Sequence, residues 1–401
     1  MGDLMKPKSR SVIVQGIRIL VAVALCALPL IAQGSLFSWL GLKGQNPNDV
    51  ATEAASLRED GNIVGLALSP DGHTLATTAY ENLLIHIWDW RTGRIVRTLK
   101  KLPGSGNRYV TEPLRFSPDG RFLALCGGVG GAQVVIQVWN PETGAVVHDL
   151  ANPNPHGNPN RHGSIDCQSI AFSPDGKRLF AVFNRNTYST TDSLIAYSTR
   201  TWQPVWGLPT PSLQMTTLAV SPDGRFLAVG GMYTPPRNSN APGSEFQARI
   251  VIVDVARHVI VRRFTPFSRP FLSLNQLAWS PDGVHLAAGP WVANPGPDDA
   301  VRIFDTRTGA LVTRETTPNE THIYGLRYTP NGQYLIESAL GGHIRIWDGQ
   351  HQHLLQSIKG VAESLAVSAD SRYLAMGGTD KVLVWKLKQA QPIHPIDHKE
   401  E

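Results

Sequence analysis

The chain has 401 residues, of which 42% are hydrophobic and 17% charged, so it is long enough to bury a substantial core. Its 37 glycines and 29 prolines indicate frequent turns and favour many short strands over long helices. The net charge of +5 is small for this length, and no basic stripe is interleaved with aromatic residues, which argues against a nucleic-acid partner.

The N-terminal region differs from the rest of the chain. Basic residues from Lys6 to Arg18 precede an apolar run at residues 19–32, an order typical of a secretory signal peptide. The uncharged stretch continues to residue 42 and could instead span a membrane, while a short hydrophobic arm on a cytoplasmic protein is a third reading. We expect residues 1–34 to be a signal peptide or the start of an anchor that could cover residues 19–42. The rest of the chain would then be exported, to the periplasm or the extracellular space, or anchored outside the membrane.

After residue 60 the sequence is a series of short apolar runs. Examples are IHIW at residues 85–88, VVIQVW at 134–139, IVIV at 250–253 and VRIF at 301–304. The runs are rich in β-branched and aromatic residues and are bounded by Gly, Pro, Asn and Asp, a pattern that predicts β-strands. The fold class is therefore all-β.

A tetrapeptide, SPDG, punctuates these runs. It begins at residues 69, 117, 173, 221 and 280, and two degenerate copies follow, TPNG at 329 and SADS at 368. A second signature, of the form Trp-Asp-x-x-Thr-Gly, follows each copy in a stronger or weaker version. Seven units with a period of about 40 to 60 residues, each holding four strand-sized segments, indicate a propeller.

The chemistry of SPDG is that of a turn. Pro has a preset φ at the second position, Asp suits the third and Gly takes the left-handed conformation, so we expect a hairpin between the first two strands of each unit. A metal-binding or catalytic role is disfavoured, because each turn offers one carboxylate and the turns are spread around a rim. The predicted structural turn residues are Asp71, Gly72, Asp119, Gly120, Asp175, Gly176, Asp223, Gly224, Asp282, Gly283, Asn331 and Gly332.

The frame SPDG-x-x-LA followed by IWD-x-x-TG-x-V resembles the WD40 repeat over about residues 50–387, and also resembles bacterial exported propellers with SPDG turns. The resemblance implies a seven-bladed β-propeller with four antiparallel strands, a to d, in each blade. The Gly-His dipeptide common in that family before strand a is absent, and Trp ends strand c in only four units. The family's buried Asp-His-Ser/Thr-Trp network is therefore not expected to carry over as such.

Closure of the ring follows from a missing strand. The last unit reaches strand c at residues 381–385, and the polar tail after Leu387, residues 388–401, contains two prolines and no further strand. Ala51–Arg58 occupies the place of a strand d before the first strand a. We predict that it completes the last blade, with residues 35–49 as a linker and residues 50–387 as the propeller.

Long insertions gather on one face of this propeller. Antiparallel strands place the a–b and c–d turns on one face and the b–c and d–a loops on the other. The long segments fall on the second face, at residues 101–107, 151–163, 184–191, 232–247 and 290–298. Loops on a rigid scaffold often bind partners. The alternative for any one of these loops is that it is only a surface insertion with no binding role. The predicted binding residues are Arg161, His162, Arg185, Tyr188, Tyr233, Arg237 and Trp291.

Apart from Cys26 in the N-terminal region, the chain has two cysteines, Cys126 and Cys167. Both lie in apolar, strand-like stretches, so buried free thiols are the favoured interpretation and a single bridge is the alternative.

These observations predict a non-catalytic scaffold whose variable loops bind a protein or peptide partner. We expect no cofactor, no metal and no nucleic acid, a monomeric propeller, and membrane contact through the N-terminal segment if it is not cleaved. The alternative is an exported propeller enzyme, a lactonase or a cofactor-dependent dehydrogenase, with a site at the axial channel. The sequence shows no cluster of acidic residues and His that would favour the enzyme.

Overall fold

The computed structural model divides the chain into two units, Met1–Asp49 and Val50–Glu401, and the second is described here by itself. The residues that the structure describes are 49–79, 84–101, 114–126, 136–151, 165–185, 192–210, 213–233, 247–267, 273–291, 300–314, 322–340, 342–350, 353–360 and 362–389. The predicted leader or anchor, Cys26, and most of the linker and polar tail lie outside them. The described residues contain no helix that is long and apolar enough to cross a membrane.

Among the described residues of the second unit every element is a β-strand, and the strands form seven blades. The innermost strands, a, are β1 (Ala51–Leu68), β5 (Leu114–Phe116), β9 (Ile165–Phe172), β13 (Leu213–Val220), β17 (Ser273–Trp279), β21 (Ile323–Tyr328) and β25 (Ser364–Val367). Strands b are β2 (Thr74–Ala79), β6 (Leu123–Cys126), β10 (Arg178–Arg185), β14 (Phe226–Tyr233), β18 (His285–Trp291), β22 (Tyr334–Ala339) and β26 (Tyr373–Gly377).

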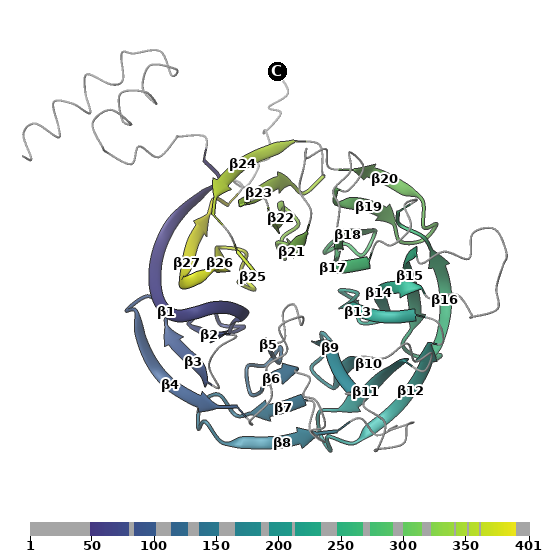
Figure 1. The fold of residues 1–401 in the computed structure, drawn as a ribbon, viewed down its shortest axis with the longest axis horizontal. Coiled ribbons are helices and arrows are strands. Elements are labelled where there is room, and N and C mark those ends of the chain that lie inside the picture. The colour runs from purple at the N-terminus through teal and green to yellow at the C-terminus, as the bar shows by residue number, and fades with distance from the viewer. Residues whose placement is uncertain are drawn as a thin grey trace, which may run out of the picture. The chain divides into compact units, whose positions relative to one another are not determined.

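Strands c and d complete the blades. Strands c are β3 (Leu84–Asp89), β7 (Ile136–Trp139), β11 (Asp192–Ser198), β15 (Gln247–Asp254), β19 (Arg302–Asp305), β23 (His343–Asp348) and β27 (Thr379–Leu387). Strands d are β4 (Arg94–Lys100), β8 (Val146–Leu150), β12 (Pro204–Thr210), β16 (Val259–Phe264), β20 (Leu311–Arg314) and β24 (Leu354–Lys359). Each blade pairs its strands antiparallel in the order a–b–c–d, and the blades stand side by side in a ring (Figure 1).

Strand β1 closes the ring, as the missing fourth strand predicts. Its first part, from Ala51 to Arg58, pairs antiparallel with β27 as strand d of blade 7. Its second part, from Ile63 to Leu68, pairs with β2 as strand a of blade 1. Figure 1 shows β1 running from the outside of the ring to the inside. Blades 7 and 1 consequently share one seven-stranded sheet, β25-β26-β27-β1-β2-β3-β4.

The core consists of one apolar cluster at each boundary between blades. In strand a the side chains alternate, so that Leu114 packs on blade 1 while Ala67 of blade 1 packs on blade 2. The equivalent leucine of blade 5, Leu277, packs toward blade 4, and Ala278 packs toward blade 6. Because alternate side chains of strand a point to opposite sides, each blade packs against both of its neighbours.

The SPDG segments form the a–b turns by a shared set of hydrogen bonds. In blade 1 the amide of Gly72, whose φ is +68°, donates to the Ser69 carbonyl at 2.8 Å. The Ser69 hydroxyl donates to Asp71 Oδ1 at 2.5 Å and accepts from the amide of Thr74 at 2.9 Å. The degenerate copies keep this arrangement, with Asn331 accepting in blade 6 and Ser371 taking the positive φ in blade 7. The aspartates accordingly act within the turns.

These hydrogen bonds predict a dependence of stability on pH. The Ser173 hydroxyl and the Lys177 amide hold the pKa of Asp175 below its ordinary value, and the pKa values of Asp223 and Asp282 are also lowered. A carboxylate with a lowered folded-state pKa stabilises the fold above its unfolded pKa of about 3.9 and loses that effect as pH falls through the folded pKa. We expect the melting temperature to fall as pH drops below about 4. A triple variant with Asn at these three positions should show a shallower fall, and equal slopes would contradict this account.

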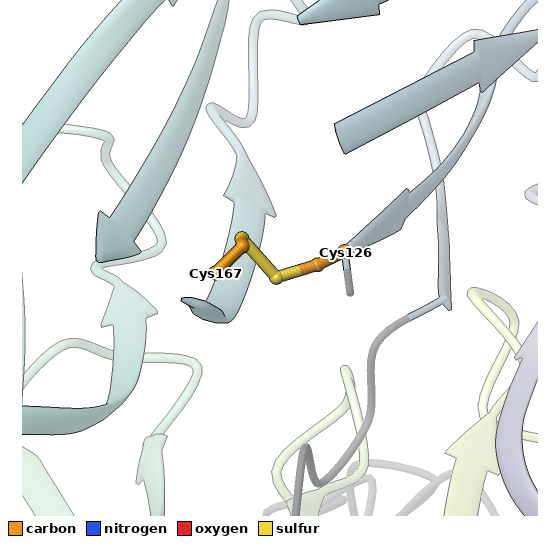
Figure 2. Close-up of a disulfide and its surroundings, with 2 residues drawn as sticks. All are labelled: Cys126 and Cys167. Carbon is orange, nitrogen blue, oxygen red and sulfur yellow. A yellow bond between two sulfur atoms is a disulfide. The ribbon is translucent and has the colours of Figure 1, made fainter. Parts of the chain in front are cut away.

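A disulfide joins Cys126, at the end of β6, to Cys167 in β9 (Figure 2). The prediction of free thiols is therefore wrong. Strand b of blade 2 and strand a of blade 3 place the two Cα atoms 5.6 Å apart, a separation that a disulfide spans. Both side chains are buried in the cluster between these blades, so the bond links the neighbouring blades covalently.

Candidate functional site

The two faces of the propeller differ in what they present. We call the face formed by the SPDG and c–d turns the turn face, and the face formed by the b–c and d–a connections the loop face. Of the predicted binding residues, Tyr233 and Trp291 lie at the loop-face ends of β14 and β18. The backbone of Arg185 lies at the corresponding end of β10. Arg161, His162, Tyr188 and Arg237 lie outside the described residues.

Trp291 belongs to an aromatic group at the boundary of blades 5 and 6. Its ring stacks on His322, with centroids 5.0 Å apart and planes 9° from parallel, and the two residues also form a β-bridge. His322 in turn contacts Tyr324 edge to face at 6.2 Å. Trp291 is 44% exposed despite this stacking. A large indole face held by a neighbouring ring is a preorganised contact for a partner.

Charged groups flank these rings. The guanidinium of Arg249, at the start of β15, lies 3.6 Å from the centre of the Tyr233 ring, which fixes the tyrosine by a cation–π contact. Burial, and then the negative charge of Glu363 before β25, raise the pKa of the Tyr324 hydroxyl above its ordinary value. Tyr324 is consequently neutral and able to donate a hydrogen bond at physiological pH.

His322, Tyr324 and Arg249 are site residues that the sequence prediction missed. They lie at the starts of strands rather than inside the long loops, so a search of the insertions passes over them. For His322 and Tyr324 the available signal is their position, because they lie just before and at the start of a strand a, at its loop-face end. Among the described residues, no group of three or more His, Cys, Asp or Glu is placed to hold a metal ion.

Blade 1 contains a buried polar network of its own. The Trp88 indole donates to Thr77 Oγ1 at 2.9 Å, and the Thr77 hydroxyl donates to Glu59 Oε2 at 2.5 Å. The other carboxylate oxygen of Glu59 lies 2.7 Å from His86 Nδ1. Glu59 comes from the crossover of β1 and is 3% exposed. This network connects the closing strand β1 to the rest of blade 1. The sequence had led us to expect no buried network of this kind, and here its carboxylate is that of Glu59.

Two arginines interrupt a row of alanines in the innermost strands. Arg115 and Arg327 stand two residues before the turn Ser or Thr, where the other five blades have Ala. Each guanidinium donates to the carbonyl of the residue before it, Leu114 or Leu326. Burial lowers the pKa of both arginines to about 10, so both remain charged at neutral pH. Blades 2 and 6 therefore each have a charged guanidinium group on the innermost strand.

Comparison with known proteins agrees with the repeat pattern. The family model "WD domain, G-beta repeat" matches residues 313–348, which run from β20 through β23. This matched unit contains strand d of blade 5 and strands a, b and c of blade 6, so the sequence repeat is offset by one strand from the blade. That offset is the reason why one strand of blade 7 comes from the beginning of the propeller.

Parts of several curated proteins are similar to this chain. SEC12-like protein 2 of Arabidopsis thaliana is 27% identical over 51% of this chain and 48% of its own length. Protein HIR1 of Chaetomium globosum is 24% identical over 62% of this chain and 23% of its own length. Small ribosomal subunit protein RACK1 of Caenorhabditis elegans is 29% identical over 31% and 35%. The chain thus spans less than half the length of these relatives. The repeat match and these relatives agree with the resemblance to the WD40 family.

The relatives contradict the predicted location. They include a small ribosomal subunit protein, which is intracellular, and none of those named above is an extracellular protein. The prediction of export or of a propeller anchored outside the membrane relied on the composition of residues 1–42 alone. Apolar runs of that kind are not specific to exported proteins. The similarity of the propeller to intracellular relatives argues against export.

Proposed function

We propose that the loop face binds a protein or peptide partner and that the group formed by Trp291, His322 and Tyr324 is its anchoring point. The observation that carries the proposal is the exposed Trp291 ring held parallel to His322. Trp and Tyr are the residue types that contribute most to binding energy at protein interfaces. Support also comes from the protein partners that the WD40 relatives suggest.

The rigid frame explains how such a surface can bind tightly. Trp291 ends a strand b and His322 precedes a strand a, so both are positioned by paired backbone rather than by a free loop. A side chain that is ordered before binding loses little conformational entropy when the partner arrives. Tyr233, held by Arg249, extends the surface to blade 4. The loop residues Arg161, His162, Arg185, Tyr188 and Arg237 complete the proposed surface.

The test is selection of binding peptides from a displayed library with the full chain, followed by affinity measurements on variants. Trp291→Ala is expected to weaken the selected ligand by about 2 kcal/mol, or roughly thirtyfold, as for other interface hot spots. Leu311→Ala is the matched control, because Leu311 is 49% exposed but lies on the outer strand β20. Unchanged affinity of the Trp291 variant for every selected peptide, or an equal loss in the control, would overturn the proposal.

A further inference from the structure

The turn face contains a groove between blades 4 and 5, with a volume of about 870 Å³. We call it the 4/5 groove. Its lining includes the apolar side chains of Phe226, Ile252 and Trp279. The Trp279 indole donates to the carbonyl of Ala219 at 3.1 Å, which fixes this apolar floor across the two blades. The volume is in the range of pockets that accept a drug-sized ligand, and it suits a short peptide segment.

Four arginines line the same groove. Arg225 follows the SPDG turn of blade 4, Arg257 lies in the c–d turn of that blade, and Arg307 lies in the c–d turn of blade 5. All three are exposed. Arg262 of β16 is half-buried and donates to the carbonyl of Thr306. The groove therefore combines an apolar floor with several guanidinium groups.

The carboxylates of the groove are engaged by their own turns. Asp223 Oδ1 accepts from the Ser221 hydroxyl at 2.6 Å and from the Arg225 amide at 3.0 Å. Asp282 has the equivalent two bonds, and Asp254 Oδ1 accepts from two amides of the c–d turn. Arg257 Nε also lies 3.9 Å from Asp254 Oδ2. Four guanidinium groups against three carboxylates leave the groove with an excess of one positive charge, which suits an additional anion.

The neighbouring groove shows that the fold does not need these arginines. The equivalent positions between blades 5 and 6 are occupied by uncharged residues, namely Val284, Thr308, Thr313 and Gln350. The turns there have the same backbone hydrogen bonds, for example from Gly309 to Asp305 as from His258 to Asp254. A basic residue also follows the a–b turn in blades 2, 3 and 7, so the distinguishing feature of the 4/5 groove is that four arginines line it together.

We propose that the 4/5 groove is a docking site for an acidic peptide segment that carries a bulky apolar side chain. The apolar side chain packs against Phe226 and Trp279, while carboxylates of the segment bind the guanidinium groups, whose planar fork suits them. A nucleic acid fits less well, because its continuous phosphates would meet Asp223 and Asp282 and would leave the apolar floor uncovered. This site lies on the opposite face from Trp291 and can be occupied at the same time.

The experiment selects ten-residue peptides from a displayed random library with the full chain and measures binding of the enriched peptides by fluorescence anisotropy. We expect some of them to carry Asp or Glu beside Leu, Ile, Phe or Trp. A variant with Ala at Arg225, Arg257 and Arg307 should bind such a peptide at least about tenfold more weakly. Binding should also weaken as salt rises from about 0.05 to 0.5 M, since exposed charges are screened.

Two controls accompany this variant. Arg121→Ala removes an arginine at the same turn position in blade 2, where its guanidinium lies 5.4 Å from the Phe122 ring, as that of Arg225 lies 5.4 Å from Phe226. It should bind normally, as should Val146→Ala, because Val146 is 48% exposed on the outer strand β8 of blade 2. The proposal is wrong if no acidic peptide is enriched, if the triple variant binds with full affinity, if either control loses as much affinity, or if a single-stranded oligonucleotide displaces the peptide.

Discussion

A chain that lacks residues 45–60 is expected to lose the cooperative unfolding transition of the propeller. The deletion removes the strand that pairs with β27 and leaves blade 7 with three strands. It also removes Leu57, which is 3% exposed, and Glu59, which holds Thr77 and His86. Loss of a single buried leucine side chain costs about 2 to 5 kcal/mol, and a domain is stable by only about 5 to 15 kcal/mol.

Thermal unfolding followed by circular dichroism checks this prediction. Two point variants test whether the stabilising effect of β1 comes from its buried side chains. Leu57 and Glu53 lie on this strand, but Leu57 is buried and Glu53 is exposed. Leu57→Ala should lower the melting temperature and Glu53→Ala should leave it nearly unchanged. A second control deletes residues 391–401 and is expected to have no effect. If the 45–60 deletion melts at the temperature of the intact chain, β1 does not close the ring.

Reduction of the Cys126–Cys167 disulfide is expected to lower the free energy of unfolding by about 4 kcal/mol. The bond closes a loop with a sequence separation of 41 residues, and the loss of unfolded-chain entropy for a loop of that length corresponds to this magnitude. Denaturant unfolding of the same chain with and without a reductant measures the effect without creating a cavity. A double Cys→Ala variant should be insensitive to the reductant.

Thiol titration of the denatured, unreduced chain gives an independent answer. The chain has three cysteines, so with the disulfide formed only the thiol of Cys26 should react. Three reactive thiols, together with equal stability in both conditions, would contradict the bridge.

The fold was largely predictable because its signals are local and repeated. Ser, Pro, Asp and Gly each have a defined part in the a–b turn, and the same hydrogen bonds recur in every blade. Closure by Ala51–Arg58 also followed, since the last unit lacks a strand that the ring requires. These inferences depend on the order of elements along the chain and need no knowledge of side-chain contacts.

The parts that could not be predicted depend on proximity between blades. Cys126 and Cys167 meet because strand b of one blade faces strand a of the next, which their separation in sequence does not reveal. The stack of Trp291 on His322 arises in the same way. The 4/5 groove was missed because attention to the long loops directs the search to the opposite face. Comparing equivalent turn positions from blade to blade would have shown the arginines.

Amide hydrogen exchange of the full chain, with and without a peptide whose binding depends on Trp291, tests the central claim most directly. The proposal that the loop face binds a partner predicts slower exchange at the end of β18 and the start of β21, around Trp291 and His322. It also predicts little change at the SPDG turns on the opposite face. Slower exchange confined to the turns, with no change near Trp291 and His322, would contradict the proposed binding surface.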